Sequence, residues 1–190
     1  LPDCTVLDGC IYVSASLEHP GVLVQHGPIL RVVFGPRDPS YISPILSAIQ
    51  SDLCESGIDG VLSTHIQRDA LEKFSYVSPI GAAGVYLHAV AGDFQKEGPA
   101  RELFKSMIRE ISALAAAMGY PFEKDYVKIN LEILSNLSAD ATTSMQRDIM
   151  EGKPSELDGL VMEPLRLAKK YSVSMPCYEE VAKVLCPSEF

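Results

Sequence analysis

The sequence lacks any regular spacing of cysteines. It has five of them, Cys4, Cys10, Cys54, Cys177 and Cys186, and no two form a C-x-x-C pair. Disulfide-stapled scaffolds and structural zinc sites both depend on regular cysteine spacing. The pattern therefore favours reduced thiols and predicts a cytoplasmic protein.

Membrane, signal and nucleic-acid features are also missing. No apolar run is long enough to cross a bilayer, and no signal peptide is visible. The chain begins at Leu1 rather than Met, so we expect a fragment of a longer protein and give the missing signal little weight. The net charge is −9 and the cations are scattered singly, which argues against nucleic acid as a partner. An anionic small ligand is still compatible, because one or two local cations can hold a carboxylate.

Glycine motifs and histidine clusters of known chemistry are absent as well. The sequence contains neither G-x-G-x-x-G nor G-x-S-x-G, so it carries no dinucleotide fingerprint and no hydrolase elbow. Gly81 and Gly84 fall within a helical pattern, and we interpret them as positions of close helix packing. The histidines have no ligand spacing and predict no metal site; they are His19, His26, His65 and His88.

The first third of the chain has the pattern of a small α/β unit. Strands are predicted at residues 10–15, 21–25, 30–35 and 60–63, with a turn at His26-Gly27-Pro28 between the second and third. Residues 42–54 have helical spacing. This sheet with one covering helix is too small to be a complete domain. We therefore expect the sheet to expose an unpaired edge or face.

From Gln67 onward the apolar period is that of helices. The first helical face is interrupted at Pro79, and later helices are expected at residues 99–118, 125–137, 140–151, 155–171 and 178–185. Ser155 and Asp158 occupy the positions of a capping box, and Pro164 predicts a kink or a broken turn.

Four polar residues remain as candidates for chemistry: Lys73, Ser144, Asp148 and Glu156. Taken singly, each is more often structural than catalytic. A helical lysine is usually solvated, and a glutamate in a first helical turn usually complements the helix dipole. Composition and spacing therefore indicate only an α/β fragment joined to a helical domain.

Several segments resemble the ketopantoate reductase (2-dehydropantoate 2-reductase) family. The most specific is residues 142–158, which match the signature S-M-x-x-D-x-x-x-G-x-x-[ST]-E-[IL]-D. Residues 6–15, 21–35, 66–74 and 167–176 resemble other family segments, so the similarity covers nearly the whole chain.

The resemblance implies an α/β fragment, the end of a Rossmann-type domain, followed by an all-α domain of the 6-phosphogluconate dehydrogenase C-terminal type. Residues 1–66 would be the last part of the NADP-binding domain, and residues 67–190 the helical substrate-binding domain. The implied activity is NADPH-dependent reduction of ketopantoate in a cytoplasmic homodimer, with no metal, nucleic acid or membrane partner. The glycine-rich half that binds the cofactor is not in this sequence, so we expect the chain alone to fold but to be inactive.

The resemblance also assigns roles to residues. Lys73 falls on the proton-donating lysine, Ser144 on a serine that binds the substrate, and Glu156 on a glutamate that contacts the cofactor. The tight turn at residues 152–154 is expected to set Ser144 and Glu156 on consecutive helices that face one cleft. Asp148 lies one turn after Ser144 and is expected to position Ser144 rather than to contact the ligand itself. Ser78 and Ser14 are further substrate-binding candidates.

The chain departs from the family at two positions after the lysine. Asparagines that often follow it by four and eight residues are Val77 and Gly81 here, which leaves the identity of the 2-keto acid open. One alternative is a related reductase of another branched or bulky 2-keto acid. The other is a helical interaction or dimerisation module without catalysis.

Overall fold

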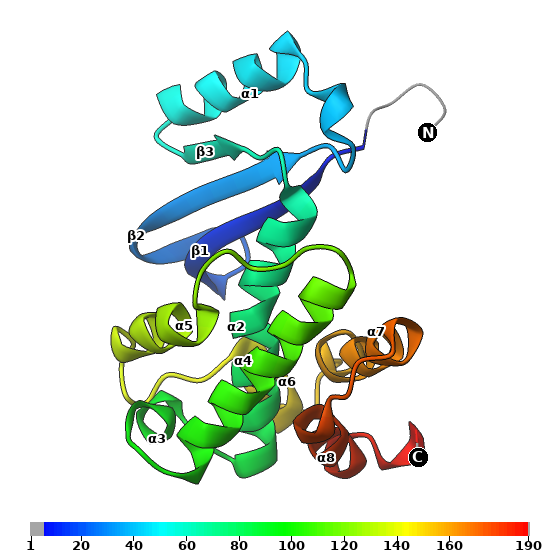
Figure 1. The fold of residues 1–190 in the computed structure, drawn as a ribbon. Coiled ribbons are helices and arrows are strands. Elements are labelled where there is room, and N and C mark those ends of the chain that lie inside the picture. Colours follow the sequence, from blue (N-terminus) through cyan, green and yellow to red (C-terminus); the bar gives the residue numbers. More distant parts are fainter. Residues whose placement is uncertain (1–5, 190) are drawn as a thin grey trace. The chain divides into compact units, whose positions relative to one another are not determined.

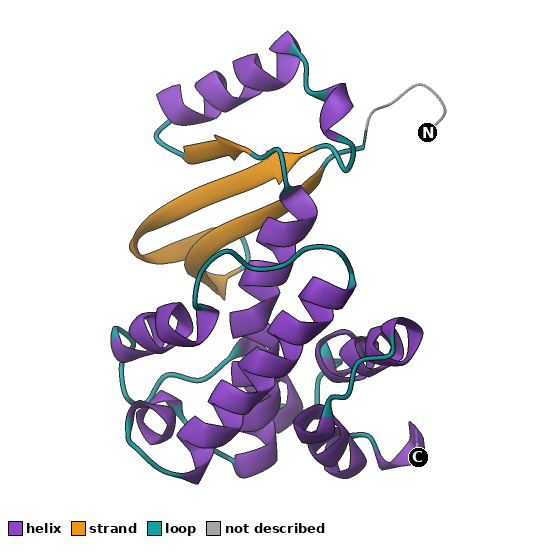
Figure 2. Ribbon diagram, viewed as in Figure 1, coloured by secondary structure: helices purple, strands orange, loops and turns teal. Residues whose placement is uncertain are grey.

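The computed structural model describes residues 6–189, and the chain divides into two compact units. The first unit is Leu1–Ala70 and the second is Leu71–Phe190, so the division falls inside one helix. Figure 1 traces the chain from the strands of the first unit to the helices of the second, and Figure 2 distinguishes helices from strands by colour. The predicted fold class, a short sheet followed by a mostly helical region, is confirmed.

The first unit is built on a long β-hairpin. Strand β1 (Asp8–His19) runs antiparallel to β2 (Val22–Gly35), and β3 (Asp59–Leu62) adds to β2 in parallel, giving the order β1-β2-β3. The prediction of two separate strands at residues 21–25 and 30–35 was wrong. Pairing passes from Val13↔Leu30 to Ala15↔Gln25, so residues 26–29 bulge within one continuous strand. A bulge bends a strand without ending its ladder.

One helix and a small core complete this unit. A 3₁₀ turn, η1 (Pro39–Tyr41), leads into α1 (Pro44–Glu55), which packs on β3. The contact is close: a Cβ placed on Gly60 would lie 2.9 Å from the Cβ of Leu53. Cys10, Val33 and Ile66 form the buried cluster of the unit. Many other apolar side chains of the hairpin stay exposed, as the unpaired sheet led us to expect.

The second unit consists of helices around one large core. Helix α2 (Ile66–Leu87) enters it from the first unit. The remaining elements are α3 (Ala91–Gln95), α4 (Pro99–Ala117), α5 (Tyr126–Ser135), α6 (Ser144–Met150), the π-helical turn η2 (Asp158–Met162), α7 (Glu163–Tyr171), α8 (Pro176–Leu185) and the 3₁₀ turn η3 (Pro187–Glu189). The apolar stripe of α4 forms the centre of the core, where Phe104, Met107, Ile108 and Ile111 are fully buried.

Helix α2 continues through Pro79, which corrects the predicted interruption. A proline has no N–H to donate to the carbonyl four residues earlier, here that of Ser75. The structure supplies another donor, because the buried Asn130 Nδ2 of α5 donates to the Ser75 carbonyl at 3.0 Å and to its hydroxyl at 3.1 Å. A partner from a second helix thus satisfies the group that the proline leaves unpaired, and the helix is preserved.

The same arrangement occurs at Pro164. The carbonyl four residues earlier belongs to Leu160, and the Ser78 hydroxyl donates to it at 2.6 Å. The expected broken turn takes the form of η2, which precedes α7. The predicted capping box of Ser155 and Asp158 was wrong: helical structure begins at Leu157 without a side-chain cap, and Asp158 pairs with Arg166.

Candidate functional site

The helical unit contains a pocket of about 260 Å³. Its walls come from α2, from α3 with the residues just before it, and from the segment that leads into α6. Ser144 lines this pocket, and so do Val77 and Gly81 of α2. The structure therefore brings together one predicted site residue and the two positions at which the chain departs from the family.

Helix α6 lies against α2 at two glycines. A Cβ on Gly81 would come within 3.1 Å of the Met145 methyl group, and one on Gly84 within 2.7 Å of the Gln146 amide. The interpretation of these glycines as helix-packing positions is confirmed. Because both glycines face α6, its first turn is fixed directly beside the pocket.

The first turn of α6 is held by a cap that the sequence analysis missed. The predicted helix at residues 140–151 begins only at Ser144, because Thr143 is its N-cap. The Thr143 hydroxyl accepts from the Gln146 N–H at 3.2 Å, and the Gln146 side chain accepts from the Thr143 N–H at 2.9 Å. The T-x-x-Q spacing of a capping box was the available signal.

Gln146 also ties this turn to the end of α2. Its side chain is buried, and its Nε2 donates to the Ala89 carbonyl at 2.8 Å. Two backbone bonds continue the contact, from Ala91 N–H to the Ala141 carbonyl and from Gly92 N–H to the Ala139 carbonyl. The pocket wall is therefore fixed by hydrogen bonds on both sides.

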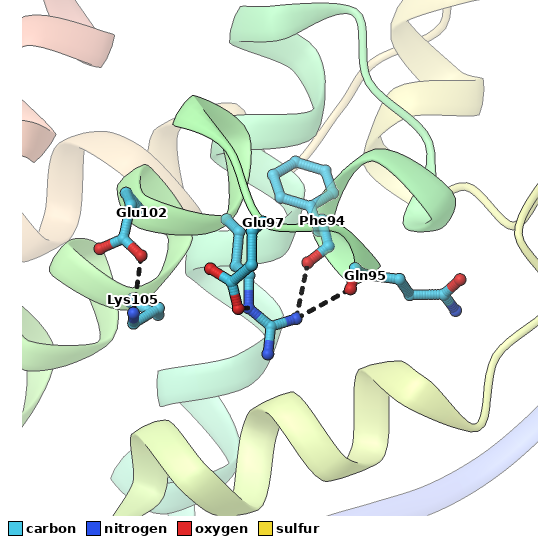
Figure 3. A network of polar contacts seen from close by, with 6 residues as sticks. Phe94, Gln95, Glu97, Glu102 and Lys105 are labelled. Atoms are coloured by element: carbon cyan, nitrogen blue, oxygen red, sulfur yellow. Dashed lines mark hydrogen bonds and ion pairs between the residues drawn. The ribbon is translucent and has the colours of Figure 1, made fainter.

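A second polar network fixes the short helix α3, which supplies Phe94 to the pocket. Arg101 donates to the carbonyls of Phe94 and Gln95 at 3.2 and 3.0 Å, and pairs with Glu97 at 3.3 Å. Figure 3 shows these partners around the end of α3, with the neighbouring Glu102–Lys105 pair. Gln95 in turn donates to the Leu134 and Leu137 carbonyls at the end of α5.

Lys73 lies on α2, half-buried, on the same helical face as Val77 and Gly81. Residues four apart on a helix lie nearly above one another, separated by about 6 Å along the axis. Lys73 itself does not line the pocket. It is one turn nearer the start of the helix than Val77.

Ser144 is the exposed first residue of α6. Within residues 6–189, its hydroxyl has no hydrogen-bond partner. Its substrate-binding role stays a prediction, since no ligand is present to test it.

Ser78 has a different environment from the one expected of a substrate contact. Its side chain is fully buried, and its hydroxyl is bonded to the Leu160 carbonyl and, at 2.5 Å, to the Tyr178 hydroxyl. Burial raises the pKa of Tyr178 far above its ordinary range. The Ser78 hydroxyl thus joins α2, η2 and α8 inside the core, which explains a serine here without a ligand.

The remaining predicted residues are not among those that line the pocket. Asp148 is half-buried on α6, one turn after Ser144. Glu156 is exposed in the connection before η2, and not on a helix, so the expected placement on consecutive helices was wrong. Ser14 is exposed on β1 at the bulge of the hairpin.

Tyr76 is the unusual polar residue of the pocket lining. Its phenol oxygen is buried and has no hydrogen-bond partner in the described part of the chain, and its ring packs edge-on against Phe104. Burial raises the pKa of Tyr76 to about 12. The hydroxyl therefore stays protonated at neutral pH.

Among residues 6–189, no three His, Cys, Asp or Glu side chains converge as metal ligands would. Over the same residues, no helix has both the length and the apolar character of a membrane span.

The sheet order and helical core define the class of this protein. It has the end of a Rossmann-type domain followed by an all-α domain. The chain belongs to the ketopantoate reductase PanE/ApbA C-terminal family, whose model matches residues 65–187. The suspected family is thereby confirmed.

Known proteins share part of this sequence or this fold. The 2-dehydropantoate 2-reductase of Aquifex aeolicus is 26% identical over 84% of this chain and 52% of its own length. The crystal structure of 2-dehydropantoate 2-reductase from Geobacter metallireducens superposes with a TM-score of 0.85 at 22% identity, covering 96% of this chain and 60% of that one. A dimeric ketopantoate reductase from Staphylococcus aureus gives a TM-score of 0.79 at 19% identity, covering 97% and 62%. The chain thus spans about half to three-fifths of the length of these proteins.

Proposed function

We propose that this chain is the substrate-binding and proton-donating part of an NADPH-dependent reductase of a 2-keto acid, with ketopantoate as the first candidate. The observation that carries the proposal is the pocket, where Ser144 meets the face of α2 that also bears Lys73. Family membership supports the reductase activity.

The chemistry requires a proton donor beside the substrate carbonyl. A reduced nicotinamide, when bound, supplies the hydride. The Lys73 ammonium donates the proton to the developing alkoxide and stabilises its charge. The Ser144 hydroxyl binds the substrate carboxylate or hydroxyl. Asp148 supports the first turn of α6, and Ser14 is a further substrate contact.

The cofactor is not held by this chain alone. Glu156 is the one residue proposed to contact it, and the sequence has no glycine-rich loop to receive the pyrophosphate. We therefore expect the chain to bind NADPH weakly and to have no reductase activity. Calorimetric titration checks this, and micromolar binding would mean that the cofactor site is misplaced.

The test of Lys73 uses a protein in which this chain is joined to a dinucleotide-binding half. Lys73→Ala should lower kcat by at least about 10²-fold, the scale of a lost general acid. The exposed Lys128 of α5 gives the control, because Lys128→Ala should leave kcat unchanged. An unchanged kcat in Lys73→Ala would remove this lysine from the mechanism.

The test of Glu156 separates cofactor binding from folding. Glu156→Ala should weaken NADPH binding in the same joined protein and leave the melting temperature unchanged, since the side chain is exposed. A lower melting temperature with unchanged cofactor affinity would assign Glu156 a structural role.

A second candidate is reduction of another branched or bulky 2-keto acid, and Val77 and Gly81 in the pocket favour it. We further propose a homodimer, as in the dimeric neighbour, and a cytoplasmic location. Cys10, Cys54, Cys177 and Cys186 are free thiols, which supports a reducing compartment; Cys4 lies outside the described residues. A monomer mass by light scattering at high concentration would contradict the dimer.

A further inference from the structure

The polar side chains of the pocket lining are almost all engaged with protein groups. The capping bonds occupy the Thr143 hydroxyl and the Gln146 oxygen, and Ala89 receives the Gln146 amide. The Thr142 hydroxyl lies 3.4 Å from the guanidinium of Arg147, which donates to it. Thr143 and Gln146 are therefore largely engaged, whereas Thr142 keeps its O–H to donate to a ligand.

Two other hydroxyls of the lining have no partner among the described residues. That of Tyr76 has essentially no accessible surface, so a ligand in the pocket cannot reach it. That of Ser144 is unpaired within the described residues but belongs to an exposed side chain, at the mouth rather than in the interior. The interior is therefore apolar, lined by residues such as Ile80, Phe94 and Met145.

No charged side chain lines the pocket in the part of the chain that the structure describes. A carboxylate inside would therefore lose its hydration without gaining an ion pair, which is unfavourable. The size of the pocket, about 260 Å³, suits a bulky group, because an apolar cavity of roughly 150 Å³ already accepts benzene. A ligand should place its charge at the mouth and its apolar part within.

The position of the pocket fits such a ligand. Val77 and Gly81 line it, and Lys73 follows on the same face one turn away. Helical side chains all lean toward the N-terminus, so Lys73 and Val77 keep their spacing of one turn along this face. A carbonyl beside Lys73 and a substituent beside Val77 can then belong to one small molecule.

We propose that the substrate is a 2-keto acid with a bulky, wholly apolar substituent, and that the pocket beside Val77 and Gly81 receives this substituent. The proposal rests on the 2-keto acid reductase function stated above and, within it, favours the second candidate over ketopantoate. It makes Val77 a specificity-determining residue, because a side-chain amide at this position would offer a hydrogen bond to a substrate hydroxyl and valine offers none.

A matched pair of ligands tests this substituent class. Ketopantoate is trimethylpyruvate with one added hydroxyl, so the two differ only in the group at issue. A hydrophobic pocket rejects an added hydroxyl by up to about 10²-fold, because the hydroxyl loses water without gaining a partner. We expect trimethylpyruvate to bind at least about tenfold more tightly than ketopantoate.

The measurement uses the 190-residue chain with ¹³C-methyl-labelled methionine. The Met145 methyl group lines the pocket next to Gly81, so its resonance reports occupancy. Trimethylpyruvate, ketopantoate and benzene are titrated separately. Benzene has neither a carboxylate nor a ketone, so its entry tests the apolar pocket alone.

A variant at Val77 gives the second readout. Val77→Asn should reverse the preference toward ketopantoate, whereas Val77→Leu should keep trimethylpyruvate ahead. Equal or tighter binding of ketopantoate to the unmodified chain, or no benzene shift at Met145, would overturn the proposal. If benzene enters but neither keto acid binds, the titration is repeated with NADPH in the protein joined to a dinucleotide-binding half. Failure of both keto acids to bind there as well would leave the pocket in place and overturn the 2-keto acid function, together with the substrate class built on it.

Discussion

The two units of this chain use apolar residues in opposite ways. In the hairpin of the first unit, Leu23 is 74% exposed and Leu17 63% exposed, although both belong to the alternating apolar pattern of their strands. In the second unit, Phe104 and Met107 of α4 are fully buried. A sheet must bury one face against another layer to stabilise a fold, and a helix must bury its apolar stripe. Most of the stability of the chain therefore belongs to the helical unit.

The comparison also separates two kinds of polar contact. An ion pair of the first unit such as Arg31–Asp59, at 3.4 Å, is solvent-exposed on both sides and contributes little. In the helical unit, buried side chains bond to backbone groups of other helices: Asn130 to Ser75, and Glu110 to the Cys177 and Tyr178 N–H groups at the start of α8. Losing such a partner leaves a buried group unpaired, so these contacts specify how the helices pack.

Truncating the centre of the helical core should have the largest effect. Phe104→Ala should lower the free energy of unfolding by about 3–5 kcal/mol, through lost burial and a cavity. Leu23→Ala in the exposed hairpin is the control, expected within about 0.5 kcal/mol of the unmodified chain. Urea unfolding followed by helical circular dichroism measures both. A similar loss in the two variants would remove the contrast between the units.

Removing the partner of the Ser75 carbonyl should rank second. Asn130→Leu should cost about 1–3 kcal/mol, because the carbonyl facing Pro79 becomes a buried unpaired acceptor. In Pro79→Ala, residue 79 regains an N–H that can donate to the Ser75 carbonyl. Asn130→Leu should therefore lower the free energy of unfolding by less when Pro79→Ala is also present. A double-mutant cycle by urea denaturation tests this. Additive losses would show that the two positions are not coupled.

A methyl group between α2 and α6 should cost somewhat less. In Gly84→Ala, the added Cβ would lie 2.7 Å from the Gln146 amide, which is held by Thr143 and Ala89. Overpacking of this kind costs about 1–3 kcal/mol, and we expect the lower half of that range because a side chain can shift. Gly159→Ala, with open space around its Cβ, is the matched control. Equal melting temperatures for the two variants would contradict close packing at Gly84.

Alkaline pH should have the smallest effect, and it should act on the helical unit. Burial raises the pKa of Cys177 to about 11 and that of Tyr76 to about 12, from ordinary values of 9.0 and 10.0. The folded state favours the protonated form of both groups. Their contribution to the free energy of unfolding is therefore complete below pH 9 and is lost as the pH rises toward 12. The melting temperature should fall over this window.

Tyr76→Phe isolates the tyrosine contribution. Its buried hydroxyl has no partner among the described residues, so the variant should be as stable as the unmodified chain at pH 7 or slightly more stable. Its melting temperature should also fall less between pH 10 and pH 12. A clear loss of stability at pH 7 would show that the hydroxyl is bonded.

Local pattern was sufficient for much of the architecture. The apolar stripe of α4, the helix-packing glycines of α2 and the strand pattern of β1 can each be recognised in the sequence without knowing which elements lie next to them. The family signature at residues 142–158 likewise depends on the sequence alone, and the match over residues 65–187 confirms the family that it indicated.

Only the tertiary structure decided how the helices meet. Pro79 ends a helix by local rules, yet α2 continues because a side chain 51 positions later in the sequence pairs with the freed carbonyl. Ser78 looked available for a ligand, and the fold engages it with Leu160 and Tyr178. Each outcome depends on a donor or acceptor from a distant segment. Short-range periodicity has no information about such partners, and they are what separates a core hydroxyl from a candidate site.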